Sequence, residues 1–263
     1  MKNLFFIFFI FSLSISYSQV SIEKTLKISV DEIFADDFDN FYTISNNILT
    51  KYNYKGKKVA SFSSEIGSEI TYIDVKNPQK ILVFFRNENE FILLDNKLSK
   101  ISEEISLNDF DIFGDALIKN ATIGGYWIYD TSKKQVLKIN SNFKLEYKKD
   151  IKVNSKIISI SDNSENIFLL KNSGDLMAYN FNTGNQKELP VYKLCKNFKI
   201  IEDNIACYSG NLHSIWLQNY MTGKKSKIKL PIKTEIIRAS IGKNKIFSFN
   251  KNKVYISKIT KPN

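Results

Sequence analysis

Residues that break regular structure are scarce in this sequence of 263 residues, which contains 10 glycines and 4 prolines. This scarcity excludes a collagen-like chain and the Pro- and Gly-rich linkers that often separate domains. At the same time, 43% of the residues are hydrophobic and 13% are aromatic, a composition that excludes intrinsic disorder. The sequence therefore predicts one globular domain without an internal linker.

Metal-ligating and nucleophilic residues are also few. There is one histidine, His213, and there are two cysteines, Cys195 and Cys207. Neither a Cys-x-x-Cys pair nor a cluster of cysteine and histidine occurs, so the sequence has no zinc ligand set. A Ser/His/Asp triad would have to include His213, which falls in an expected turn, and no Gly-x-Ser-x-Gly elbow is present. We therefore predict no catalytic residue, no metal ligand and no bound cofactor.

Arginine is nearly absent, since Arg86 and Arg238 are the only two although the net charge is +11. Recognition of phosphates and bases favours the planar guanidinium group of arginine, and the lysines here are scattered along the chain. We therefore expect no nucleic-acid partner. Two interpretations of the lysine surplus remain open: a solvated surface, or contact with an acidic surface such as lipid headgroups or an anionic polysaccharide.

Long apolar runs are confined to the N-terminus, where Lys2 precedes the apolar segment 4–11. Ser16 and Ser18 place small residues at the two positions that a signal peptidase reads. These features predict a cleaved signal peptide over residues 1–18 and a mature chain beginning at Gln19. The alternative, a retained membrane anchor, needs roughly 20 apolar residues, about twice the length of this run. We expect an exported protein without a membrane span after cleavage, located in the periplasm, at the outer membrane or outside the cell.

Export would permit a disulfide between Cys195 and Cys207, because oxidising compartments preserve such bonds. The hairpin expected in this region does not place the two residues directly opposite each other. Two separate buried thiols are the alternative, and the sequence leaves this choice open.

Capped segments of helical length are missing, whereas short β-rich runs separated by polar turns recur with a period of about forty residues. The first copy is typical, with expected strands at 33–35, 41–44, 48–54 and 59–62. In the second copy the fourth strand is expected at 98–107. The third copy is the least regular and centres on 125–129 and 136–139. Six copies of four strands predict an all-β fold, a six-bladed β-propeller that spans residues 19–263 as a single domain. Another all-β architecture is the alternative.

The sixth copy ends one strand short, whereas the segment 21–30 precedes the first copy as a spare strand. We expect this N-terminal strand to complete the last blade. Closure of the ring in this way removes the strand edges that an open array would expose.

The segment 73–78, Ile-Asp-Val-Lys-Asn-Pro, together with its continuation to residue 96, resembles a group of exported small β-propeller proteins of uncharacterised function. Members carry an Ile-Asp-Val-x-Asn-Pro segment in their second blade, and residues 126–130 match their next blade. The resemblance covers roughly the first half of the mature chain. It implies an envelope or extracellular setting beside outer-membrane assembly or secretion machinery, and it implies no catalytic residue.

Two groups of residues have both a structural and a functional interpretation. Asp36, Asp37 and Asp39 form an acidic loop, but its spacing differs from that of a calcium loop, and turns stabilised by Asx side chains explain the same residues. Trp127 and Trp216 lie within expected apolar strands. We interpret them as core residues, with an exposed platform for carbohydrate or peptide as the alternative.

Loops between the second and third strands of the copies share one face of a closed ring, around one mouth of its channel. Binding residues tend to lie on loops held by a rigid scaffold. The candidate binding face consists of Asn46, Arg86, Glu88, Asp130, Ser132, Asn172, Asn211, His213 and Asn250.

These observations favour a non-enzymatic binding or scaffolding module of the cell envelope that contacts one or more envelope proteins through a propeller face. One alternative is an exported propeller that binds carbohydrate or a polyanion. A second alternative is a hydrolase or lyase that uses carboxylates at the mouth of the channel.

Overall fold

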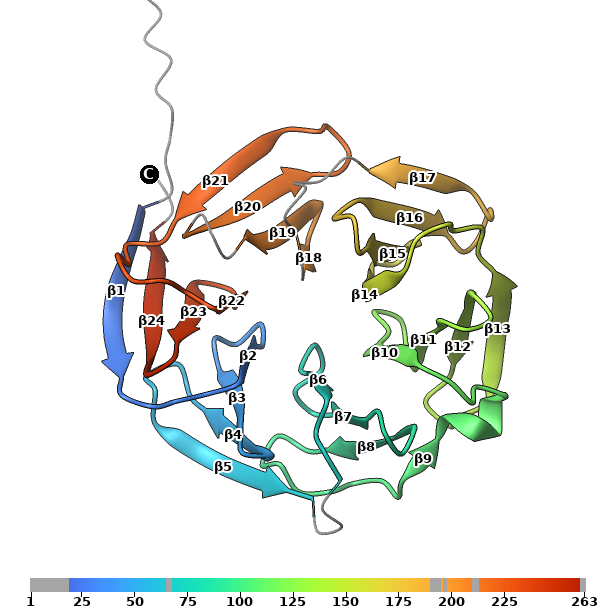
Figure 1. The fold of residues 1–263 in the computed structure, drawn as a ribbon, viewed down its shortest axis with the longest axis horizontal. Helices are drawn as coiled ribbons and strands as arrows, with labels where there is room; N and C mark the ends of the chain where they lie inside the picture. Colours follow the sequence, from blue (N-terminus) through green and yellow to red (C-terminus); the bar gives the residue numbers. More distant parts are fainter. Residues whose placement is uncertain (1–18, 65–67, 190–194, 196–197, 210–212, 261–263) are drawn as a thin grey trace, which may run out of the picture.

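The computed structural model describes residues 19–64, 68–189, 195, 198–209 and 213–260. Over these residues the chain forms six four-stranded antiparallel sheets, arranged as blades around a central axis (Figure 1). The predicted all-β class and the six-bladed β-propeller are confirmed. The expected signal peptide, residues 1–18, lies outside the described residues. Within the described part of the chain, no helix has the length and apolar character needed to cross a bilayer.

The first three blades follow one another along the chain, and in each the first strand lies closest to the axis (Figure 1). Blade 1 contains β2 (Glu32–Ala35), β3 (Phe41–Ser45), β4 (Ile48–Tyr52) and β5 (Lys58–Ser63). Blade 2 contains β6 (Tyr72–Asp74), β7 (Ile81–Phe85), β8 (Glu90–Leu94) and β9 (Ile105–Ser106), followed by the 3₁₀ helix η1 (Leu107–Phe110). Blade 3 contains β10 (Ala116–Asn120), β11 (Tyr126–Asp130), β12 (Gln135–Ile139) and β13 (Leu145–Asp150).

The second half of the ring repeats this arrangement. Blade 4 contains β14 (Ile157–Asp162), β15 (Asn166–Lys171), β16 (Leu176–Asn180) and β17 (Gln186–Leu189). Blade 5 contains β18 (Phe198–Ile201), β19 (Asn204–Ser209), β20 (Ser214–Asn219) and β21 (Lys225–Lys229). Blade 6 contains β22 (Arg238–Ile241), β23 (Lys245–Asn250), β24 (Lys253–Thr260) and, from the other end of the chain, β1 (Gln19–Leu26).

Closure of the ring by the N-terminal strand is confirmed. β1 pairs antiparallel with β24 from Gln19 opposite Thr260 to Leu26 opposite Val254, with one irregularity between Ile22 and Lys24. Figure 1 shows β1 and β24 side by side in this blade. Blade 6 therefore holds the first and last strands together through backbone hydrogen bonds.

The core is divided into six hydrophobic clusters, one at each interface between neighbouring blades. Alternate side chains of a strand point to opposite faces of its sheet, so the middle strands of a blade contact both neighbouring blades. For this reason all five residues of β7 are buried. The outer strand β5 covers one edge and is mostly exposed or half-buried.

Two strands of blade 3 were not predicted, and one strand of blade 2 was predicted too long. β13 carries polar and charged residues at nearly every position because it faces solvent, so it lacks an apolar run. In blade 2, segment 98–107 was expected to be one strand. Leu98 instead adopts a left-handed φ of 61° in a turn, and pairing as a strand is limited to Ile105–Ser106.

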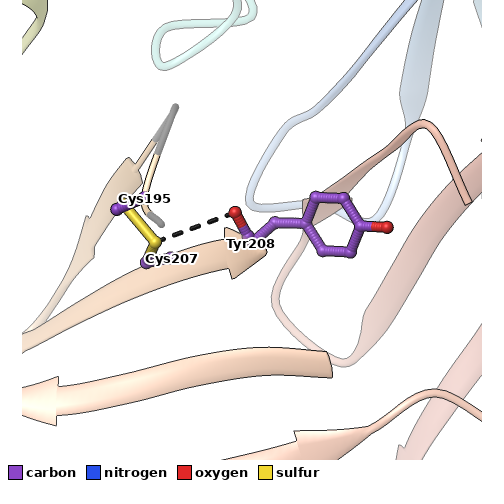
Figure 2. The surroundings of a disulfide bond; sticks show 3 residues. All are labelled: Cys195, Cys207 and Tyr208. Atoms are coloured by element: carbon purple, nitrogen blue, oxygen red, sulfur yellow. Dashed lines mark hydrogen bonds between the residues drawn. A yellow bond between two sulfur atoms is a disulfide. The ribbon is translucent and has the colours of Figure 1, made fainter. Parts of the chain in front are cut away.

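Cys195 and Cys207 form a disulfide, with a Cα–Cα distance of 5.6 Å (Figure 2). Cys207 lies in β19 opposite Phe198, so the two cysteines do not face each other across the hairpin, as the sequence indicated. The bond instead ties the connection before β18 to the second strand of blade 5. Both side chains are buried, and the Cys207 Sγ lies 3.8 Å from the carbonyl oxygen of Tyr208 (Figure 2).

Candidate functional site

Each blade has the same strand order, so the turns between second and third strands lie on one face, called here the upper face. The turns between first and second strands lie on the opposite, lower face. The predicted binding residues that the structure describes belong to turns of the upper face or to strand ends beside them: Asn46, Arg86, Glu88, Asp130, Ser132, Asn172, His213 and Asn250. Asn211 lies outside the described residues.

Several of these residues hold turns or neighbouring blades in place. Arg86 donates from Nη1 to Asp115 Oδ1 at 2.8 Å, which joins blade 2 to the segment leading into blade 3. The buried Asp130 carboxylate accepts hydrogen bonds from the backbone amides of Ser132 at 2.8 Å and Lys133 at 3.0 Å. These contacts give Arg86, Asp130 and Ser132 structural roles.

The other upper-face residues have local environments that differ from one another. Asn250 donates from Nδ2 to Tyr255 OH at 3.1 Å. The backbone amide of Asn46 donates to the Asp31 carboxylate. The backbone amide of Asn172 donates to a carbonyl oxygen in the connection that leads into β14. Glu88 lines a groove beside blade 1. His213 has a left-handed φ of 45°, and its buried Nδ1 has no hydrogen-bond partner among the described residues.

A cavity of about 140 Å³ lies beside the central axis, and none of the predicted residues lines it. It is bounded by the first strands of all six blades. One lining residue from each blade, in chain order, is Phe34, Tyr72, Lys119, Ser161, Lys199 and Ser240. We take this central cavity as the candidate functional site because every blade contributes to it.

Three lysines, Lys76, Lys119 and Lys199, line the central cavity. Lys76 forms an ion pair with Asp162, and Lys199 pairs with Asp37 at 2.7 Å. Lys119 has no carboxylate partner among the described residues.

The ammonium group of Lys119 lies 5.6 Å from the centre of the Tyr72 ring, a cation–π geometry. Lys119 is half-buried. Its charge is therefore available to a ligand that enters the central cavity.

Carboxylates near the central cavity are engaged in structural contacts. The buried Asp74 accepts from the backbone amide of Lys76 at 2.8 Å and from that of Asn120 at 2.9 Å. The buried Asp162 accepts from the backbone amide of Thr122 at 2.6 Å and from Trp127 Nε1 at 3.2 Å. These contacts link blades 2, 3 and 4 on the lower face.

Two tyrosines beside the central cavity remain protonated at neutral pH. Burial raises the pKa of Tyr72 well above its usual range, and the neighbouring Asp74 adds to this shift. Burial also raises the pKa of Tyr208, followed by the effect of Glu235, and the Tyr208 hydroxyl donates to the carbonyl of Ile236 at 2.8 Å. Lysine, tyrosine and serine thus make the cavity rich in hydrogen-bond donors.

An Asx turn explains Asp36 in the acidic loop of blade 1, as the sequence indicated, whereas Asp37 forms an ion pair with Lys199. Asp36 Oδ1 accepts from the backbone amides of Phe38 and Asn40, each at 2.9 Å. Asp39 instead binds the turn of blade 6 through the backbone amide of Asn244 at 2.8 Å. Among the described residues no group of three or more His, Cys, Asp or Glu side chains could hold a metal ion.

The two tryptophans have different environments. Trp127 is buried in the core between blades 3 and 4, which confirms the structural interpretation for this residue. Trp216 is half-buried, with the Lys227 ammonium group 4.9 Å from its ring.

Sequence reasoning missed the ring of polar residues at the last position of the inner strands. Asp74, Asn120 and Asp162 occupy this position in blades 2, 3 and 4, and each is at most 5% exposed. The sequence signal for these residues is an Asp or Asn that ends the first strand of successive copies. This repeat was not recognised because β10, the first strand of blade 3, was not predicted.

No protein-family model matches the chain, and no curated protein matches it. Among solved structures the chain is similar to virginiamycin B lyase from Staphylococcus aureus, with a TM-score of 0.61 and 11% identity over 92% of this chain and 100% of that chain. It is also similar to a streptogramin B lyase, with a TM-score of 0.61 and 14% identity over 92% and 98% of the two chains. A catalytically inactive histidine-to-alanine variant of the Staphylococcus aureus enzyme with quinupristin matches with a TM-score of 0.59 and 12% identity over 92% and 100%. At these identities the likeness shows the propeller fold alone.

Proposed function

We propose that this chain is a non-enzymatic binding propeller that holds an acidic group of a partner protein in its central cavity. The observation that carries the proposal is Lys119, a half-buried lysine of the cavity wall without a carboxylate partner among the described residues. A positive charge in a confined site attracts an anion more strongly than one in open water, because the surrounding dielectric is lower.

Two exposed apolar residues support a protein partner, because each directly follows a residue that lines the central cavity or binds a lining residue. Phe38 is 70% exposed and directly follows Asp37, a cavity-lining residue. Ile123 is 58% exposed and directly follows Thr122, whose hydroxyl binds Lys76 at 2.5 Å. Exposed apolar residues around a polar anchor are typical of protein-binding surfaces. The partner segment would carry one acidic side chain between apolar neighbours.

Fluorescence anisotropy with a labelled peptide of alternating phenylalanine and glutamate tests this function. Replacing each glutamate by glutamine in the peptide should abolish binding, and Lys119→Gln should weaken it about tenfold, the effect of losing one charge-assisted hydrogen bond. Lys225→Gln, a change of an exposed lysine in β21, is the matched control. Equal affinity of the wild type and Lys119→Gln would contradict the proposal.

The setting proposed for this function is the cell envelope, beside outer-membrane assembly or secretion machinery. Its support is the pattern of residues 1–18 and the resemblance in blades 2 and 3. N-terminal sequencing of protein recovered from a cell-surface or periplasmic fraction should begin at Gln19. Recovery of chains that still begin at Met1 would contradict cleavage.

A hydrolase or lyase is the second candidate, because Asp37 and Asp74 both line the central cavity. The lyase names of the structural neighbours suggest quinupristin as the first compound to test. Conversion followed by chromatography and mass spectrometry, present in the wild type and absent in Asp37→Asn, would favour this candidate over a binding function. An unchanged compound with both proteins would leave binding as the conclusion.

A further inference from the structure

A groove of about 300 Å³ lies between blades 3 and 4 on the upper face, away from the central cavity. This is the lower end of the size range of ligand pockets. Its walls come from the end of β11, the turn that follows, and the connection into β14. The lining residues are Asp115, Tyr129, Thr131, Lys134, Asn154, Ser155, Lys156 and Ile157.

Tyr129 is the most informative of these residues. The side chain is only 2% exposed, and it belongs to the hydrophobic cluster with Val136, Ile151 and Ile157. Its hydroxyl has no hydrogen-bond partner among the described residues, and it is not one of the fully enclosed polar atoms, so it reaches the groove. A hydroxyl at a groove wall is available to a polar group of a ligand.

The Tyr129 hydroxyl is a donor over the whole physiological range. Burial raises its pKa to about 12, and the neighbouring Asp130 carboxylate contributes to the shift. A protonated phenol can donate to a hydroxyl or an acid oxygen of a ligand.

Two lysines border the same groove without carboxylate partners among the described residues. The backbone carbonyl of Lys134 accepts from Ile151 at 2.8 Å, and that of Lys156 accepts from Asn172 at 2.9 Å, so both main chains are held in place. Both side chains are exposed. The carboxylate at the groove, Asp115, is paired with Arg86.

We propose that this groove binds an acidic sugar, with the acid group held by Lys134 and Lys156 and a ring hydroxyl bound by Tyr129. Asn154 and Ser155 supply further amide and hydroxyl groups for the remaining sugar hydroxyls. The lysines select a negative charge, whereas the neutral donors and acceptors select a polyhydroxylated ligand. The groove has none of its lining residues in common with the central cavity, so the inference does not depend on the function proposed above.

Isothermal titration calorimetry with digalacturonate tests the inference, with maltose and inorganic phosphate as separate probes. Digalacturonate should bind, maltose should bind at least about tenfold more weakly because it lacks the charge, and phosphate should bind more weakly because it lacks the hydroxyls. Maltose or phosphate binding as tightly as digalacturonate would overturn the acidic-sugar assignment, as would absence of digalacturonate binding.

Four variants locate the site. Tyr129→Phe preserves the ring in the core and should weaken digalacturonate binding about fivefold, and Lys134→Gln combined with Lys156→Gln should weaken it more than tenfold. Lys225→Gln combined with Lys229→Gln makes the same charge change on β21 and should leave the affinity unchanged. Equal losses in both double variants, or no effect of Tyr129→Phe in a protein with unaltered thermal unfolding, would overturn the inference. Lys119→Gln should leave this affinity unchanged, which separates the groove from the central cavity.

Discussion

Buried carboxylates at the inner strand ends have a structural role at the scale of single residues. Asp162 is 4% exposed and accepts hydrogen bonds from Thr122, Trp127 and Lys76. These donors come from blades 2 and 3, whereas Asp162 belongs to blade 4. A single carboxylate therefore connects three consecutive blades.

Asp162→Asn should destabilise the protein by about 2–3 kcal/mol. The amide keeps the shape of the side chain but loses the charge, and it places an NH₂ group against donors, so buried donors lose a partner. Urea unfolding followed by circular dichroism measures the change. Asp175→Asn, in an exposed turn, is the control and should change stability by less than about 0.5 kcal/mol. Similar losses in both variants would contradict the role given to Asp162.

At the scale of elements, turn geometry decides how closely parts of one blade approach each other. The turn between β10 and β11 contains Gly124 and Gly125, which both have left-handed φ values, 48° and 81°. A Cβ on Gly125 would lie 2.0 Å from the carbonyl oxygen of Ile139, whereas one on Gly124 would meet nothing within 4 Å. Only Gly125 is thus required for close approach of the backbone.

Gly125→Ala should cost at least about 3 kcal/mol, because strain at positive φ is combined with a clash against backbone. Gly124→Ala should cost only about 1 kcal/mol, the strain term alone. Thermal unfolding of the two variants, which differ by one position, measures the difference. Equal stability of the two proteins would show that the turn relaxes around the added methyl group.

The disulfide links Cys195, which precedes β18, to Cys207 in β19. Its two cysteines are 12 residues apart. Removing the bond in a double variant, Cys195→Ser with Cys207→Ala, should lower stability by about 3 kcal/mol, since the unfolded chain regains the freedom that a closed loop of this size removes. Urea unfolding of the oxidised wild type, the reduced wild type and the variant makes the comparison. Agreement between the reduced protein and the variant is expected, and equal stability of all three would contradict a structural role.

Tyrosines distributed through the blade interfaces determine how the whole molecule responds to alkaline pH. Burial raises the pKa of Tyr126 and Tyr129 to about 12, and burial is also the main cause of the raised pKa of Tyr42. Tyrosine in an unfolded chain has a pKa of about 10. Above that pH, the unfolded chain loses protons that the folded ring retains, and unfolding becomes more favourable. Lys51, whose pKa is lowered by burial, opposes this effect as a single group.

Stability should therefore be constant up to about pH 9 with respect to these tyrosines and should fall as the pH rises from about 10 through about 12. Urea unfolding across this range, with tyrosinate absorbance recorded in parallel, measures the effect. Tyrosinate absorbance should rise together with the loss of β-structure. Complete ionisation of the tyrosines in a ring that stays folded would contradict the burial of their hydroxyls.

The sequence by itself determined the all-β class, the six blades and the N-terminal closing strand. Strands packed on both faces must be apolar along short runs, so this information is local and repeats along the chain. β13 escaped prediction because an outer strand faces solvent and needs few apolar residues, and the fourth strand of blade 2 was predicted too long.

Only the tertiary structure decided which residues meet. The upper-face residues could be placed by topology, whereas the central cavity with Lys119 and the groove with Tyr129 were not found. In the sequence Tyr129 has the context of a core aromatic residue. Only the packing of the neighbouring blade shows that its hydroxyl faces the groove and has no partner among the described residues. The pairing of Cys195 and Cys207 also remained undecided, because Cys195 lies outside the strands and its approach to Cys207 does not follow from strand register. Contacts between blades join positions far apart in sequence, and no local pattern records them.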